Sequence, residues 1–142
     1  MLNRTAEMEY TEKNIIRITR EFHISQARQT GKRVAESLGF GKTECCIIVT
    51  GISELANNLI CHTIHGGTLV ISTVMRDGRK GIEITAEDEG PGISDIALAM
   101  QDGYSTCGGL GSGLGGVKRM MQEFEIASVP GKGTRVTARK WR

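Results

Sequence analysis

The feature that most constrains the fold is a glycine-rich segment inside the chain. Residues 89–116 hold nine of the 19 glycines in a chain of 142 residues. So much glycine disfavours long helices and strands there, whereas regular hydrophobic patterns lie on both sides of the segment. Long irregular segments within compact domains are usually functional. With a length typical of one domain, residues 1–142 are expected to fold as a single unit, with residues 1–12 frayed.

Four elements are predicted before the glycine-rich segment. Residues 14–20 indicate a strand, and apolar residues at helical spacing indicate helices over 24–38 and 42–64. Gly39 is placed to end the first helix, because glycine is favoured just after a helix C-terminus. Residues 68–76 and 80–88 alternate around Asp77 and Gly78, a pair suited to a type I′ hairpin turn.

After the segment, the pattern predicts one helix and two strands. The helix covers 116–124, and the strands cover 125–129 and 134–141; a shorter helical pattern lies inside the segment at 94–101. Strands and helices in this order predict an α+β two-layer sandwich, in which helices cover one face of a mixed β-sheet.

Composition excludes several classes of protein. The net charge is only +2 and aromatic residues make up 4%, so no nucleic-acid partner is expected. No apolar run approaches the roughly 20 residues of a membrane span, and residues 1–11 lack the apolar core of a signal peptide. The prediction is a cytoplasmic protein with no membrane partner. Its four cysteines lack zinc-site spacing and are expected to be reduced thiols.

Glu54 and Asn58 are the first candidate site residues. They lie four positions apart and therefore share one face of the predicted helix over 42–64. An amide oxygen suits Mg²⁺, which prefers oxygen ligands, and a neighbouring carboxylate can orient or deprotonate a nucleophile. An ordinary polar helix face would have the same pattern, and this alternative stays open.

Asp88 is the second candidate, at the end of a predicted strand. Gly90 and Gly92 follow it and would let a ligand approach the backbone closely. A carboxylate in this place can accept a hydrogen bond from an exocyclic amine such as that of adenine. A simple strand-ending turn uses the same residue types, so the pattern alone does not decide.

The end of the glycine-rich segment is a candidate phosphate site. Gly111, Gly113 and Gly115, with Leu114 between them, run into the predicted helix over 116–124. Exposed backbone N–H groups at a helix N-terminus favour anions. The glycine spacing also matches the dinucleotide fingerprint, but that motif must follow a strand directly, and here a long loop precedes it.

In this order, the motifs resemble those of the GHKL ATPase superfamily, which has the Bergerat ATP-binding fold. Glu54 with Asn58 resembles its N box, Asp88 with Gly90 and Gly92 its G1 box, and residues 111–115 its G2 box. Thr134 resembles the late threonine that supports the adenine-binding aspartate. The resemblance implies ATP and Mg²⁺ as cofactors, and an ATP lid over 93–110.

Longer segments are similar to the RsbT-type switch kinases of the bacterial stressosome, which are related to anti-sigma factor kinases. These segments are 27–41, 52–58, 86–96, 102–126 and 138–141. The resemblance implies a serine/threonine kinase that phosphorylates STAS-domain proteins and is then released to bind and activate a PP2C-type phosphatase. It also implies that Asn58 binds Mg²⁺ and that Glu54 activates the acceptor hydroxyl. An anti-sigma factor kinase, which sequesters a sigma factor and phosphorylates an anti-anti-sigma STAS protein, is the alternative.

Overall fold

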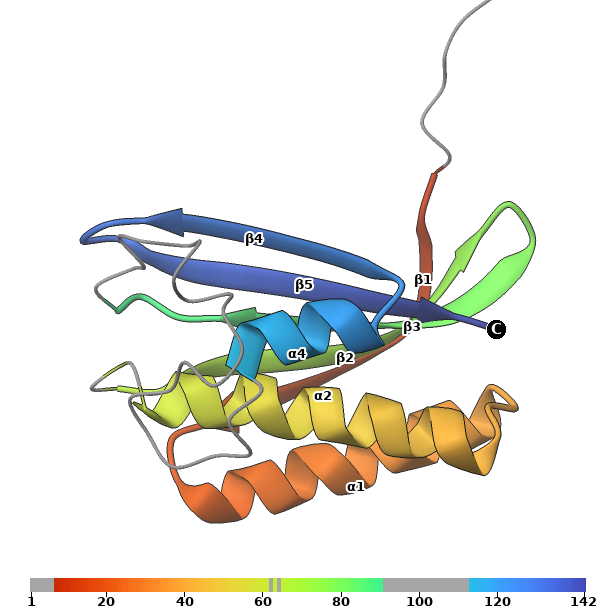
Figure 1. Cartoon of the computed structure of the whole chain (residues 1–142), viewed down its shortest axis with the longest axis horizontal. Helices are drawn as coiled ribbons and strands as arrows, with labels where there is room; N and C mark the ends of the chain where they lie inside the picture. The colour runs from red at the N-terminus through yellow and green to blue at the C-terminus, as the bar shows by residue number, and fades with distance from the viewer. Residues whose placement is uncertain (1–6, 62, 64, 91–112) are drawn as a thin grey trace, which may run out of the picture.

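The computed structural model describes residues 7–61, 63, 65–90 and 113–142. In this part of the chain a sheet of five strands is covered on one face by three helices (Figure 1). The strands, in chain order, are β1 (Glu9–Ile18), β2 (Gly67–Arg76), β3 (Arg79–Glu87), β4 (Glu123–Val129) and β5 (Gly133–Trp141). The helices are α1 (Glu21–Ser37), α2 (Lys42–Cys61) and α4 (Gly113–Met120). The predicted α+β two-layer sandwich is confirmed.

The sheet is antiparallel, whereas a mixed sheet was predicted. Its strand order is β1-β2-β3-β5-β4, and each of the four neighbouring pairs is antiparallel. The two hairpins, β2–β3 and β4–β5, set the direction within each pair. The direction of one hairpin relative to the other depends on how β5 meets β3, and the long connection between the hairpins permits either arrangement. The sequence therefore could not determine it.

The core lies between the sheet and the helices. Alternate residues of β2 and β3, such as Ile71 and Ile84, face α2, which contributes Ile48, Ile52 and Leu55; all five are at most 1% exposed. Burying a side chain of this size contributes roughly 1.5–3 kcal/mol.

Gly31 lets the two long helices approach each other closely. A Cβ at this position of α1 would collide with the Ile52 side chain of α2. The contact brings α1 against α2 and keeps α2 over the sheet, where its polar residues can contribute to a site.

Several element ends differ from the predictions. Gly39 does follow the end of the first helix, with a positive φ angle, and Asp77 and Gly78 have the positive φ angles of a type I′ turn. The first strand begins at Glu9, so residues 9–12 are not frayed; the Tyr10 hydroxyl donates to Glu83 Oε2 at 2.9 Å. Helix α2 ends at Cys61 instead of residue 64. In addition, α1 begins at residue 21, α4 covers 113–120, and the helical pattern at 94–101 lies outside the described residues.

Helix α2 corrects a second expectation. It has 20 residues, and an 18-residue window within it has a mean hydropathy of 1.3, so it is long and apolar enough to cross a membrane by length and composition alone. No such segment was expected from the sequence. Its apolar residues, among them Ile48 and Leu55, belong to the core that α2 forms with the sheet. Packing inside the domain therefore accounts for its hydropathy.

The cysteines are only partly as expected. Cys45 and Cys46 are free; Cys45 is buried and its neighbour is exposed. Burial raises the pKa of the Cys45 thiol above its ordinary value, with nearby Glu36 adding to the effect. Cys61, the last residue of α2, is disulfide-bonded, so the prediction of a reduced thiol is wrong there. No cysteine spacing in the sequence indicated this bond.

Candidate functional site

The described candidate residues come from elements that meet at one end of the domain. The C-terminal half of α2, the end of β3 and the β4–β5 turn lie at this end, and the start of α4 lies beside α2 (Figure 1). The sheet thus brings Asp88 near segments that are distant from it in the sequence. Gly92, Gly111 and the predicted lid at 93–110 lie outside the described residues.

Asp88 is held by its backbone and by one carboxylate oxygen. Its N–H donates to the Thr134 carbonyl at 3.0 Å, and its Oδ1 accepts from the Gly90 N–H at 2.8 Å. The side chain is half-buried, and Oδ2 accepts no hydrogen bond from a described residue. A Cβ at Gly133 would collide with the Asp88 carbonyl, so this position needs glycine. The Asp88 carboxylate is therefore held in place by Oδ1, while Oδ2 can accept a hydrogen bond from a ligand.

Thr134 supports Asp88 through its backbone. Its carbonyl accepts the Asp88 N–H, while its hydroxyl lies 2.9 Å from the Ser128 hydroxyl of β4. The side chain of Thr134 is therefore engaged with the neighbouring strand. This contact fixes the start of β5 behind Asp88.

Thr63 shapes the same end of the site, and sequence reasoning missed it. Its hydroxyl lies 2.8 Å from the Leu59 carbonyl and 2.7 Å from the Gly66 carbonyl. The bond to Leu59 satisfies a carbonyl exposed at the end of α2. A Cβ at Gly90 would come within 2.8 Å of Thr63 Cγ2, so only glycine lets this turn lie so close. A lone threonine beyond a helix carries no signal that could have identified it.

Glu54 and Asn58 lie on α2 as the spacing predicted. Glu54 is only 5% exposed, so an open polar helix face does not describe it. Asn58 is half-buried, and its amide makes no hydrogen bond with a described residue. An unpaired amide in such a place fits a hard cation as an oxygen ligand. Among the described residues no group of three His, Cys, Asp or Glu side chains could hold a metal, so a cation here would need ligand oxygens as well.

The start of α4 provides the remaining candidates. Gly113 has a φ of 52°, which favours glycine, and Leu114 and Gly115 are buried. Leu114 belongs to the same core cluster as Leu55 of α2. The helix N-terminus is thereby fixed against α2, and its free N–H groups can bind an anion.

A cavity beside Asp88 is lined by only part of the candidate set. This cavity of about 630 Å³ is lined by Asp88 and Gly90, but by neither Glu54 nor Asn58. Gly113, Leu114 and Gly115 do not line it either. The structure thus joins Asp88 with Gly90 and Thr134, and separately joins Glu54 with Asn58 along α2.

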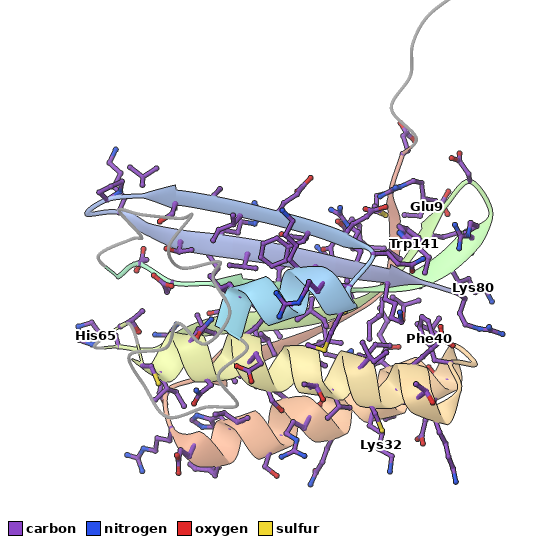
Figure 2. The ribbon with its side chains drawn as sticks, viewed as in Figure 1. Glu9, Lys32, Phe40, His65, Lys80 and Trp141 are labelled. Carbon is purple, nitrogen blue, oxygen red and sulfur yellow. The ribbon has the colours of Figure 1, made fainter. Side chains whose placement is uncertain are left out.

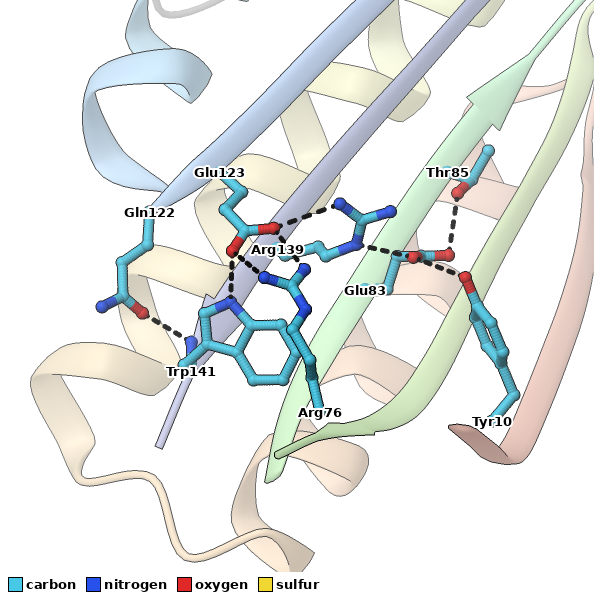
Figure 3. A network of polar contacts seen from close by, with 8 residues as sticks. All are labelled: Tyr10, Arg76, Glu83, Thr85, Gln122, Glu123, Arg139 and Trp141. Atoms are coloured by element: carbon cyan, nitrogen blue, oxygen red, sulfur yellow. Dashed lines mark hydrogen bonds and ion pairs between the residues drawn. The ribbon is translucent and has the colours of Figure 1, made fainter. Parts of the chain in front are cut away.

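A second polar cluster lies on the sheet face opposite the helices, and sequence reasoning missed it (Figure 3). The Glu123 carboxylate accepts hydrogen bonds from Nη1 and Nη2 of Arg76, both at 2.8 Å, and from the Trp141 indole N–H at 2.9 Å. Arg139 bridges Glu123 to Glu83, at 3.1 and 2.8 Å. Figure 2 shows Trp141 near one end of the molecule and His65, which lines the same cavity as Asp88, at the other.

The same cluster shifts two ionisation equilibria. Hydrogen bonds from Arg76, together with those from Trp141 and Arg139, lower the pKa of Glu123 from 4.5 to about 2. Burial and the hydrogen bond to Glu83 raise the pKa of Tyr10. All of these groups have partners within the cluster, which therefore has the character of a structural network.

Comparison with known proteins adds to this geometry. Residues 47–141 match the family described as "Histidine kinase-, DNA gyrase B-, and HSP90-like ATPase". The chain is 49% identical, over 130 residues, to the serine/threonine-protein kinase RsbT of Bacillus subtilis (strain 168); the match covers 92% of this chain and 97% of the relative. It is 35% identical to an anti-sigma F factor of Caldanaerobacter subterraneus subsp. tengcongensis, over 69% of this chain and 71% of the relative.

A solved structure agrees on the fold. The mycobacterial sensor histidine kinase MprB superposes with a TM-score of 0.54 at 13% identity, covering 96% of this chain and 97% of the other. At this low identity the likeness concerns the architecture alone. It agrees with the antiparallel sheet and helix layer described above.

Proposed function

Because the chain belongs to the family of histidine kinase-, DNA gyrase B- and HSP90-like ATPases, we propose that it phosphorylates STAS-domain proteins of a stressosome. It is an ATP-dependent serine/threonine-protein kinase, as its near full-length match to RsbT indicates. The observation that carries the ATP-binding part of the proposal is the Asp88 carboxylate, held by Thr134 and Gly90, with no hydrogen bond to Oδ2 from a described residue. Residues 1–142 would act as one kinase domain, in the cytoplasm.

Each candidate residue has a proposed part in binding. Asp88 accepts a hydrogen bond from the adenine amine, while Gly90 and Gly92 keep the backbone close to the base. Thr134 holds Asp88 in place from behind. The N–H groups of Gly111, Gly113, Leu114 and Gly115 hold the phosphates at the start of α4. Asn58 provides its amide oxygen to Mg²⁺.

Glu54 is the proposed catalytic residue. Bound Mg·ATP supplies the γ-phosphoryl group and neutralises its charge. Glu54 orients the Ser or Thr hydroxyl of the protein substrate and takes up its proton as the hydroxyl oxygen bonds to the γ-phosphorus. The bond between that phosphorus and the bridging oxygen of ADP breaks, and ADP leaves. Its position one helical turn before Asn58 puts both side chains on the same face of α2.

The proposed partners follow from the resemblance to switch kinases. After phosphorylating its STAS-domain substrates, the kinase is released from them and binds and activates a PP2C-type phosphatase. These steps would form a partner-switching cascade that controls a sigma factor of the general stress response.

The anti-sigma F factors favour one alternative. The chain is 35% identical to one of them over 69% of its length. In this alternative the kinase sequesters a sigma factor directly and phosphorylates an anti-anti-sigma STAS protein. Native co-purification distinguishes the two: a PP2C-type phosphatase supports the leading proposal, and a sigma factor supports the alternative.

The direct test is phosphotransfer from labelled ATP with Mg²⁺ to candidate STAS-domain proteins. The Glu54→Ala variant should keep its calorimetric affinity for ATP and lose transfer, whereas Glu44→Ala, in the first turn of the same helix, should keep both. Normal transfer by Glu54→Ala would refute its role as the base. Absence of label on every STAS protein tested with the wild-type chain would refute the substrate class.

A further inference from the structure

The cavity beside Asp88 opens on the face of the sheet away from the helices. Thr85 and Glu87 of β3 line it, and by strand alternation they face away from the core residues Ile84 and Ala86. A Cβ at Gly67 would come within 2.6 Å of Leu59 Cδ2 of α2 and 3.3 Å of Asp88 Cβ, so the Asp88 side chain leaves toward the helix side. Asp88 and Gly90 therefore lie at the boundary between this cavity and the proposed adenine position.

The cavity is large enough for a ligand side chain and has a mixed wall. Its volume, about 630 Å³, lies in the usual range for ligand pockets. Val70 and the methyl groups of Thr68 and Thr85 give it an apolar part. Such a wall can hold the aliphatic stem of a long side chain while its charged end reaches the rim.

The charges along the rim favour a cation. The carboxylates of Glu87 and Glu89 outnumber the guanidinium of Arg17. Glu87 has only a loose ion pair with Arg135 at 3.8 Å, between two exposed side chains, and Glu89 has no ion pair with a described residue. The Arg17 guanidinium donates to the His65 carbonyl at 2.9 Å and to the Thr68 hydroxyl at 3.3 Å, away from the carboxylates.

An exposed apolar residue lies next to the cavity on the same face. Ile15 is 71% exposed and pairs in register with Val70, whose side chain lines the cavity. A small-molecule cation would leave Ile15 uncovered. A protein surface that presents a basic side chain beside an apolar one covers both, and this favours a protein as the occupant.

We propose that this cavity is a docking pocket for a Lys or Arg side chain of a protein partner, whose adjoining apolar residue packs on Ile15. The aliphatic stem lies along Val70 and Thr85, and the charged end pairs with Glu87 and Glu89. The pocket is separate from the proposed site of phosphotransfer, since neither Glu54 nor Asn58 lines it.

The pocket also gives a route for coupling to nucleotide, a step that rests on the proposed function. Glu89 and Gly90 line the pocket, and the Gly90 N–H donates to Asp88 Oδ1, the proposed adenine acceptor. A partner that shifts this turn changes the position of the Asp88 carboxylate. By thermodynamic reciprocity, nucleotide then changes the affinity for the partner by the same factor.

The docking step can be tested without a known partner, with two capped peptides and the ¹⁵N-labelled full chain. The peptides are acetyl-Leu-Arg-methylamide and its neutral match, acetyl-Leu-Gln-methylamide. The Arg peptide should shift the amide signals of Thr68, Thr85 and Gly131 in a saturable way, and the Gln peptide should bind at least about tenfold more weakly.

Substitution of glutamates inside and outside the pocket tests the role of the rim charges. The double variant Glu87→Gln with Glu89→Gln should weaken binding of the Arg peptide by about tenfold, because it removes both rim charges. Glu125→Gln changes an exposed glutamate of β4 outside the pocket and should leave binding unchanged. Equal binding of the two peptides, or an equal loss with Glu125→Gln, would overturn the docking pocket.

The coupling step has its own readout. Saturation with Mg·ATP should change the affinity for the Arg peptide by at least about threefold. Peptide binding that is the same with and without bound ATP would overturn the coupling and leave the pocket in place. ATP binding is measured separately by calorimetry, so a failure of the proposed function, seen as no ATP binding, is distinguishable from a failure of the pocket.

Discussion

Two polar clusters of the molecule differ in whether their polar groups have hydrogen-bonding partners within the described residues. In the network around Glu123, Arg76 and Arg139, ionised groups face one another at 2.8–3.1 Å. Around Asp88, one carboxylate oxygen accepts a backbone N–H and the other accepts nothing from a described residue. The half-buried amide of Asn58 has no described partner at all.

The difference indicates what each cluster is for. Polar groups whose partners lie inside the protein contribute to stability, and their loss leaves a buried charge uncompensated. Half-buried polar groups without such partners have free hydrogen-bonding capacity and can bind a ligand instead. On this reasoning the network stabilises the fold, and the end of the sheet at Asp88 is the proposed nucleotide site.

The largest expected effect is on nucleotide affinity. Asp88→Asn replaces a carboxylate oxygen by an NH₂ group, which cannot accept a hydrogen bond from an adenine amine. Calorimetric ATP affinity should fall about a hundredfold or more, with stability changed by less than about 0.5 kcal/mol. Asp77→Asn, in the exposed hairpin turn, is the matched control and should bind ATP normally. If Asp88→Asn binds ATP with unchanged affinity, the proposed contact between Asp88 and adenine is refuted.

Breaking the network should cost stability and spare binding. Arg139→Gln leaves Glu83, whose side chain is only 8% exposed, without its ion-pair partner. The free energy of unfolding in urea at pH 7 should fall by about 2–3 kcal/mol. Arg135→Gln, whose partner is exposed and 3.8 Å away, should lose less than about 0.5 kcal/mol. Similar losses in the two variants would contradict the distinction between paired and exposed charges.

Acid should weaken the network in a defined range of pH. The folded-state pKa of Glu123 is about 2, against an ordinary 4.5, so the unfolded chain binds this proton more tightly. The contribution of Glu123 is therefore complete above pH 4.5 and is lost as the pH falls toward 2, by about 1–2 kcal/mol after allowance for its partial exposure. The free energy of unfolding of Glu123→Gln, measured in urea, should lack this part of the pH dependence. If it changes with pH between 4.5 and 2 as steeply as that of the wild-type chain, Glu123 does not make this contribution.

The smallest expected effect concerns one hydroxyl near the network. Ser72 Oγ is buried and has no hydrogen-bond partner among the described residues. Ser72→Ala should raise the free energy of unfolding by about 0.5–1 kcal/mol, because it removes a buried unpaired group. Ser128→Ala, which removes the hydroxyl contact with Thr134, should lower it by about 1 kcal/mol. If the free energy of unfolding changes in the same direction in both variants, hydrogen-bond pairing of the hydroxyl does not decide the effect on stability.

Local patterns in the sequence predicted most of the fold. Every strand and long helix of the described residues lies where periodicity indicated, because each buries a regular apolar face. The ends of elements were less accurate, since long-range contacts determine them. Residues 9–12 join β1 because β1 pairs along β2 and Tyr10 reaches Glu83, 73 positions away.

The two polar clusters differed in how far the sequence revealed them. Asp88, Glu54 and Asn58 were chosen as site residues because their neighbours form recognisable motifs, and their roles stay predictions. The network was not, because Arg76 and Glu123 lie 47 positions apart and meet only through strand register. A charge opposite a charge across a sheet leaves no local signature in the sequence.

The most direct test of the account is a titration of the ¹⁵N-labelled chain with Mg·ATP. Trp141 is the only tryptophan, so its indole N–H, which donates to Glu123, gives one signal that reports on the network. The account predicts saturable shifts of the Asn58 and Gly90 amides with little change at the Trp141 indole. A saturable shift of the indole while Asn58 and Gly90 stay unchanged would contradict it.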